Sequence, residues 1–216
     1  MESQLAAEAG AEMIELRLDF LSRAIDLKRL LVDKRCPMLA TIRRHEDGGR
    51  WTKSEDERQM LMRLAIVGGF DWVDIETDIA DKIKRYGKVK RIVSYHNMKE
   101  LPRNLEEIFE KMHHQDADVL KVAVRIDKPQ DNWRVMRLMK HAKKPTVAIA
   151  MGDYGLPSRL LGAKYVLPLP TPHSTKNGES LPVCSRSTRC VKFTTTTRST
   201  KKPKYSRLWV IRSCTA

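Results

Sequence analysis

ADVLKVAVRI, residues 117–126, reads as one buried strand that carries a single lysine. A short, continuous run of β-branched and aliphatic residues is typical of a strand covered on both faces, as in a parallel sheet. Lys121 lies in the middle of this run. A buried ammonium group is costly unless it is paired or loses its proton, so this lysine requires an electrostatic or a chemical explanation.

Similar β-branched runs occur on both sides of this stretch. Including it, the predicted strands cover residues 13–20, 37–43, 70–77, 91–97, 119–126 and 145–151. Between several of them, apolar residues recur at intervals of three and four, which predicts helices within residues 52–69, 104–115 and 130–144. Strands that alternate with helical crossovers predict an α/β protein with a parallel sheet.

Polar residues within the predicted strands favour a barrel over an open sheet. They often occupy alternate positions, so that each strand presents polar groups to one face: Glu15, Arg17, Thr41, Arg43, Asp74, Glu76, Ser94, His96 and Lys121. In a closed barrel these faces converge near the carboxyl ends of the strands, where barrel active sites lie. No strand is followed by a glycine-rich GxGxxG loop, which argues against a dinucleotide site. The prediction is a (β/α)8 TIM barrel.

The composition of the 216 residues fits one globular domain, with 41% apolar residues. There is no apolar run of membrane-spanning length and no signal-peptide pattern, so we expect a cytoplasmic protein with no membrane partner. The four cysteines show neither zinc-site spacing nor a disulfide framework. The net charge is +14, but residues 166–216 carry +9 of it, which leaves a mildly basic body. A nucleic-acid partner is therefore not favoured, because the basic tail has few aromatic residues and no recognised motif.

Each polar strand residue has a structural explanation when it is taken alone: a solvated edge for Glu15 and Arg17, a core position for His96, surface charge for Arg43 and an ion pair for Lys121. Taken together, the residues suggest imine chemistry. A desolvated lysine near other cations can attack a carbonyl as the free amine. A histidine can then remove the proton from the acidified neighbouring carbon.

In this interpretation Lys121 forms the Schiff base, His96 is the general base and Glu76 fixes the tautomer of His96. Arginine binds carboxylates and hydroxyls through paired donors, which suggests substrate-binding roles for Arg17, Arg43 and Arg159.

Six motifs, in this order, resemble one family: ELRLD, TIRR followed by DGG, DIE, SYH, LKVAV and MGDYGLPSRLLG. The family is the type I 3-dehydroquinate dehydratases, which are (β/α)8 barrels, and the resemblance covers residues 3–165. It implies a lyase that converts 3-dehydroquinate to 3-dehydroshikimate and water in the shikimate pathway, which leads to aromatic amino acids. It also implies that the enzyme needs no metal or organic cofactor and that it forms a homodimer.

The resemblance assigns a role to each matching residue. Lys121 falls on the Schiff-base lysine, His96 on the general acid/base and Glu76 on the carboxylate that orients the histidine. The remaining matches concern the substrate. Glu15, Arg17 and Arg43 fall on positions that hold ring hydroxyls, Asp47 stands near an acidic loop position, and Arg159 falls on the carboxylate-binding arginine. Two other classes stay open: a different Schiff-base barrel such as an aldolase, or a nucleic-acid-binding protein that uses its basic tail.

The sequence departs from the family pattern at both ends. The family's first strand and its last strand, with the following Ala-Pro-Gly-Gln loop, have no match, so we expect an incomplete barrel with two unpaired edges and a domain boundary at residue 165. Residues 166–216 are rich in Ser, Thr, Pro and Arg and have no strand or helix period. They are interpreted either as a disordered basic extension or as an out-of-frame translation.

A frame shift is compatible with the codons of this tail. Back-translation of residues 174–183, read one nucleotide upstream, allows Phe-Asn-Lys-Glu-Arg-Gly-Ile-Ala-Pro-Gly, which resembles the family's missing loop. Residues 208–216 allow a stretch similar to the start of shikimate dehydrogenases. In that case the intact gene would encode a fused dehydratase and shikimate dehydrogenase, and this chain would be an inactive remnant of the first half.

Overall fold

A curved, eight-stranded sheet forms the centre of the protein. The computed structural model describes residues 11–162, apart from residues 22, 24 and 33, and the strands at 190–195 and 208–214. The strands are β1 (Ala11–Arg17), β2 (Met38–Thr41), β3 (Trp72–Glu76), β4 (Lys90–Asn97), β5 (Val119–Arg125), β6 (Thr146–Met151), β7 (Cys190–Thr195) and β8 (Leu208–Cys214). The first six are parallel, and each of them pairs with its neighbours in the sequence. The six predicted strands and their parallel arrangement are therefore confirmed.

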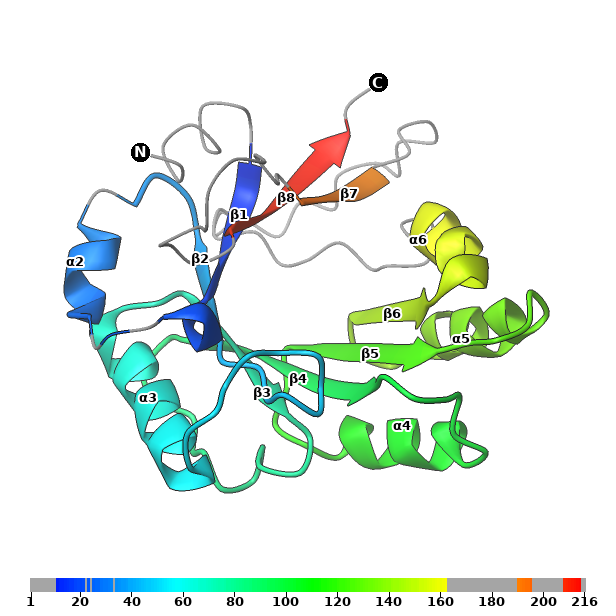
Figure 1. Cartoon of the computed structure of the whole chain (residues 1–216), viewed down its shortest axis with the longest axis horizontal. Coiled ribbons are helices and arrows are strands. Elements are labelled where there is room, and N and C mark those ends of the chain that lie inside the picture. The colour runs from blue at the N-terminus through cyan, green and yellow to red at the C-terminus, as the bar shows by residue number, and fades with distance from the viewer. Residues whose placement is uncertain are drawn as a thin grey trace, which may run out of the picture.

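The helices lie on the outer, convex side of this sheet (Figure 1). They are α2 (Leu27–Leu31), α3 (Glu55–Gly68), α4 (Leu105–His113), α5 (Asp131–Lys140) and α6 (Leu156–Gly162), with short 3-10 turns η1 (Leu18–Phe20) and η2 (Asp153–Gly155). The longest, α3, begins with a capping box between Ser54 and Glu57 and ends at Gly69, whose φ of 105° is the left-handed conformation that glycine adopts most easily. The three predicted helical segments are thus confirmed as α3, α4 and α5.

The two faces of the sheet carry different side chains, because successive residues of a strand point to opposite sides. The outward residues form the main apolar core with the helices. The inward residues near the amino ends of the strands form a second, smaller cluster of Met13, Leu39, Trp72 and Val119. Further along the same strands, the inward positions become polar. The floor of the barrel is therefore apolar, and its carboxyl end is charged.

The sheet does not close into a complete barrel within the described residues. Its strand order is β6-β5-β4-β3-β2-β1-β8-β7, so β6 and β7 are the two edges. The inward side chains of β6, Val147 and Ile149, are half-buried. The incomplete (β/α)8 barrel predicted from the sequence is confirmed by the six parallel strands, which cover only part of the circle.

The β1 edge differs from the prediction. We expected it to be unpaired, but β8 pairs with it in antiparallel orientation, and β7 pairs with β8. Residues 166–216 show no strand period, yet these two strands lie within that stretch. An exposed strand edge offers unpaired backbone groups to any extended segment that can reach it, whatever its orientation. The predicted first-strand gap, the domain boundary and most of the basic tail lie outside the described residues.

No helix in the described ranges is long and apolar enough to cross a membrane.

Candidate active site

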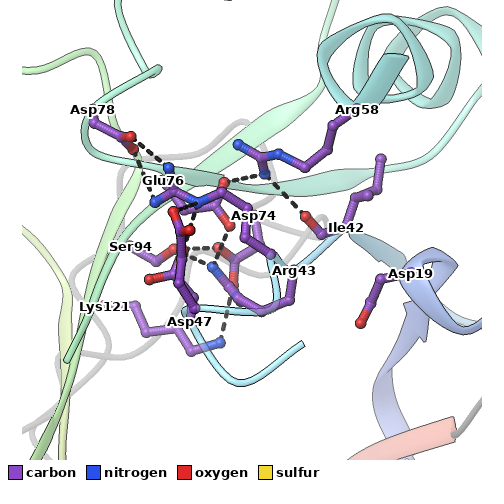
Figure 2. A network of polar contacts seen from close by, with 12 residues as sticks. Asp19, Ile42, Arg43, Asp47, Arg58, Asp74, Glu76, Asp78, Ser94 and Lys121 are labelled. Atoms are coloured by element: carbon purple, nitrogen blue, oxygen red, sulfur yellow. Dashed lines mark hydrogen bonds and ion pairs between the residues drawn. The ribbon is translucent and has the colours of Figure 1, made fainter. Parts of the chain in front are cut away.

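The polar residues of the inner face meet at the carboxyl end of the sheet, on β2 to β5. The register of the strands brings them together: Thr41 lies beside Asp74, Glu76 beside Ser94, and Ser94 beside Lys121. Arg43 lies two residues after the end of β2 and points into the same region (Figure 2). The location matches the expectation that a barrel active site forms where the parallel strands end.

Asp74 is the centre of this site. Its fully buried carboxylate lies 2.6 Å from Nη2 of Arg43 and 2.9 Å from Nζ of Lys121, both measured to Oδ2 (Figure 2). The hydroxyl of Ser94 donates to Oδ1 at 2.5 Å. Burial by itself would raise the pKa of Asp74, but Arg43 and Lys121 outweigh it, so the pKa lies well below its usual range. Asp74 is therefore an anion that accepts hydrogen bonds from Ser94 and Lys121 and forms an ion pair with Arg43.

The ion pair between Lys121 and Asp74 agrees with the structural explanation that the sequence suggested for this lysine, and the pair lies inside the barrel. The lysine is only partly exposed, with 20% of its side-chain surface accessible. The residue beside it on β4 is Ser94, and the one beside it on β6 is Val147. The amine consequently faces the interior of the barrel, where a bound small molecule would lie.

Glu76 has no hydrogen bond to His96 within the described residues, so its predicted role of orienting His96 stays a prediction. Its Oε1 accepts from Nη1 of Arg43 at 2.8 Å, and its Oε2 accepts from Nη1 of Arg58 at 2.5 Å. Burial raises the pKa of Glu76 while the two arginines lower it, and the net direction is upward. The physical reason for these partners is charge: two guanidinium groups within reach bind a buried carboxylate more strongly than a neutral imidazole does.

His96 stands at the same end of β4, and its buried Nδ1 has no hydrogen-bond partner among the residues that the structure describes. Burial lowers the pKa of this histidine, and the nearby charges of Arg43 and Lys121 lower it further, to well below the ordinary value. His96 is therefore neutral at neutral pH. A neutral imidazole with a free nitrogen can accept a proton, which is the chemistry predicted for this residue.

Arg43 is not surface charge, since it is only 3% exposed and binds both Asp74 and Glu76. Burial would lower the pKa of this arginine, but Asp74 and Glu76 raise it above its ordinary value. The guanidinium therefore stays charged at the barrel mouth. Ser94 is a third partner, because its Oγ accepts from Nη1 of Arg43 at 2.9 Å.

The other predicted substrate-binding residues are less closely connected. Glu15 and Arg17 lie on β1 and are half-buried, and Arg17 forms a bidentate pair with Asp19 at 2.7 and 2.8 Å. Asp47 binds Arg44 at 2.7 Å rather than a residue of the central network. Arg159 lies on α6 with an exposed side chain, and no hydrogen bond or ion pair within the described ranges joins it to the site. The structure therefore gathers Lys121, His96, Glu76 and Arg43, with Arg159 apart from them.

Sequence reasoning missed three members of the network. Asp74 and Ser94 share the alternating pattern of the inner face, but no role was assigned to them. Arg58 lies on α3, and a recognisable signal exists for it: the arginine occupies the same helical stripe as Met62 and Ala65, which are buried. A charged residue at such a position indicates a buried partner. In the described part of the chain, no cluster of three or more His, Cys, Asp or Glu residues could hold a metal ion.

Comparisons with known proteins agree on one family. The sequence profile of the type I 3-dehydroquinase family matches residues 1–182. The 3-dehydroquinate dehydratase of Methanothermobacter thermautotrophicus is 37% identical over 172 residues, which are 76% of this chain and 76% of that protein. The chloroplastic bifunctional 3-dehydroquinate dehydratase/shikimate dehydrogenase of Arabidopsis thaliana is 33% identical over 176 residues, 76% of this chain but only 29% of that protein.

A solved structure also shares the architecture. The 3-dehydroquinate dehydratase of Geobacillus kaustophilus superimposes with a TM-score of 0.64 at 26% identity, over 76% of this chain and 73% of that one. The similarity therefore extends from sequence to fold.

Proposed function

Because the chain belongs to the type I 3-dehydroquinase family, we propose that it removes water from 3-dehydroquinate through a Schiff base on Lys121 and so catalyses a step of the shikimate pathway. The observation that carries this proposal is the placement of Lys121 on the inner face of the barrel, beside a neutral His96 and a buried Asp74. A lysine that serves structure alone has no need of a proton acceptor beside it.

Substrate binding would begin with charge. The carboxylate and hydroxyls of 3-dehydroquinate meet a mouth that contains Arg43 and Arg17, and Arg159 would have to approach from α6. Arginine is suited to this task because its planar group donates two parallel hydrogen bonds. Asp74 and Glu76 hold Arg43 in place before the substrate arrives, so little entropy is lost on binding.

Imine formation requires the free amine of Lys121, which attacks the ketone carbon of the substrate. The proton that the ammonium gives up on becoming the free amine returns to the hydroxyl of the carbinolamine, which leaves as water, so that a protonated imine is formed. Asp74 keeps Arg43 and Ser94 as partners when the amine leaves the ion pair, so it stays an anion. It therefore lies where it stabilises the positive charge of the imine, which is a fixed electrostatic contribution of the protein.

Elimination then needs one proton acceptor. The protonated imine withdraws electrons and acidifies the neighbouring carbon, and His96 removes a proton from it to give an enamine. His96 next donates that proton to the hydroxyl on the adjacent carbon, which departs as water. The same residue thus serves as base and as acid on one face of the ring, in agreement with a syn elimination. Hydrolysis of the imine consumes one water, releases the product and restores the amine of Lys121.

Trapping tests this proposal directly. The purified chain is incubated with 3-dehydroquinate, reduced with borohydride and digested, and the peptide that contains Lys121 is weighed by mass spectrometry. We expect a stable adduct on this lysine and none in Lys121→Ala. His96→Ala serves as the matched variant: it should form the adduct but should not produce the conjugated enone, which is followed by its ultraviolet absorbance.

A folded wild-type chain without an adduct would contradict the proposal and would favour the inactive remnant. The open sheet, in which β8 pairs with β1 in antiparallel orientation, is the observation behind this alternative. Aldol cleavage in place of dehydration would favour another Schiff-base barrel. Four statements stay predictions from the sequence. The protein is expected to be cytoplasmic, to form a homodimer and to have a domain boundary at residue 165, and a nucleic-acid partner is not favoured.

A further inference from the structure

Arg58 has an unusual environment for a residue on the outer layer of helices. It lies in the first turns of α3, yet its side chain is 0% exposed. Its Nη1 donates to the carbonyl of Ile42 at 3.0 Å and to Oε2 of Glu76 at 2.5 Å (Figure 2). Nε and Nη2 form a bidentate pair with Glu55 at 2.8 and 2.9 Å. The side chain thus reaches from the helix layer to a residue of the candidate active site.

These contacts belong to a continuous series of alternating charges. Every consecutive pair is joined at 2.9 Å or less, in the order Glu55, Arg58, Glu76, Arg43, Asp74 and Lys121. The series starts at a half-exposed glutamate on α3 and ends at the lysine on β5. Because each member is held by charges of opposite sign, a change at one member alters the next one.

Glu76 depends on Arg58 in particular. The carboxylate is 2% exposed, and it faces Arg43 from the segment after β2, Arg58 from α3 and Asp74 on its own strand. Asp74 repels its charge, so only the two arginines keep it ionised against burial. Without Arg58 a single cation would remain, and that cation is shared with Asp74. Glu76 would then bind a proton more readily, and Arg43 would lose one of its two anionic partners.

From this geometry we infer that Arg58 is a positioning residue for the reaction: it keeps Glu76 ionised, and Glu76 in turn holds Arg43 toward the substrate. The inference rests on the proposed function for its effect on catalysis. Arg58 would not contact the substrate itself, since its hydrogen bonds are to Glu55, Ile42 and Glu76.

The test compares two substitutions at this position with a control elsewhere. Arg58→Met removes the charge, whereas Arg58→Lys keeps it. The control is Arg91→Lys. Arg91 lies near the start of β4 and is also buried, at 4% exposure, but it donates to the Ala80 carbonyl and to Asp116 rather than to the charged series. Two properties are measured in each protein: the titration of Glu76 by carboxyl carbon NMR, and the pH profile of kcat/KM for 3-dehydroquinate.

In Arg58→Met we expect Glu76 to titrate at a pH about one unit higher. The ratio of kcat/KM in the variant to kcat/KM in the wild type should therefore be about tenfold lower on the acid side of the profile than at the pH optimum. The loss should appear mainly in KM, because Arg43 binds substrate. Arg58→Lys should restore most of the titration and of the profile, and Arg91→Lys should move neither. A Glu76 titration that is unchanged in Arg58→Met would overturn the inference.

A double variant separates action through Glu76 from a general loss of packing. If Arg58 acts through this carboxylate, then Arg58→Met with Glu76→Gln should be no less active than Glu76→Gln alone. Additive losses would overturn the inference. If Arg58→Met does not fold, Glu55→Gln with Arg58→Lys weakens the same contacts without removing the charge. Absence of dehydration in the wild type would contradict the proposed function, while the NMR titration would still decide the role of Arg58.

Discussion

Asp74→Asn should destabilise the protein more than any other isosteric change in the candidate active site. The side chain is completely buried and binds Arg43, Lys121 and Ser94 at 2.5–2.9 Å. Asparagine has almost the same shape, so the cavity does not change. What changes is charge: two cations, one of them nearly fully buried, lose the carboxylate that they share.

The size of the effect follows from this geometry. Removal of one partner from a buried ion pair costs about 3–5 kcal/mol, because the remaining charge is left uncompensated. Asparagine retains one oxygen that can accept from Ser94, and Arg43 keeps Glu76, so we expect the lower end, about 3 kcal/mol. A typical domain is stable by about 5–15 kcal/mol, so this loss is a large fraction of the total.

Chemical unfolding measures this difference. Wild type and Asp74→Asn are unfolded in urea at pH 7 and followed by circular dichroism, with linear extrapolation to zero denaturant. Asp127→Asn is the matched control: its ion pair with Arg125 is solvent-exposed on both sides, at 54% and 68%, and should contribute under about 1 kcal/mol. A loss below about 1 kcal/mol in Asp74→Asn would refute the reasoning.

The pH dependence provides an independent check. The folded state lowers the pKa of Asp74, so the carboxylate contributes its stability above the pKa of about 3.9 for an unfolded aspartate, and this contribution is lost as the pH falls toward the folded value. The free-energy gap between wild type and Asp74→Asn should therefore stay constant from pH 8 to about 5 and narrow below about 4. A gap that widens in acid would contradict the assignment of Asp74 as the buried anion.

Further predictions concern three other positions. The pKa of His96 is lowered by burial, so the unfolded chain takes up a proton first, and wild type should lose up to about 1.4 kcal/mol of unfolding free energy per pH unit as the pH falls below about 6.5. His96→Gln should lack this slope in urea titrations, and an unchanged slope would show that another group is responsible. Gly49→Ala would place a Cβ 2.0 Å from the carbonyl oxygen of Arg43, so we expect a lower melting temperature and a raised KM, whereas Gly87→Ala, with open space around it, should affect stability alone. Lys121→Arg should keep the ion pair with Asp74, and hence near-normal stability, but should form no borohydride adduct; an adduct in that variant would place the imine on another lysine.

The order and direction of the six parallel strands could be predicted from local patterns. Each strand is a short β-branched run, such as 119–126, and the crossovers between runs carry helical periodicity. These periods arise from the geometry of a single strand or helix, so no knowledge of distant residues is needed. The same argument placed the polar residues of alternate positions on one face, and the structure confirms this for Lys121, Arg43 and His96.

Pairing of the β1 edge could not be predicted in this way. The segments that become β7 and β8 show no clear strand period, but an unpaired edge supplies backbone donors and acceptors that reward any extended partner. Such pairing depends on which segment reaches the edge in space. Local sequence contains little information about it, because backbone hydrogen bonds are the same for every residue type except proline.

The sequence by itself determined the fold class, the inner face of the sheet and the presence of a lysine, a histidine and arginines on that face. Only the tertiary structure decided which charges pair. Glu76 binds Arg43, 33 residues away, and Arg58, 18 residues away, while Lys121 binds Asp74 at a separation of 47. The reason is physical: side-chain periodicity is fixed within one element, whereas a buried charge selects the strongest opposite charge that the folded chain brings within reach, whatever its place in the sequence.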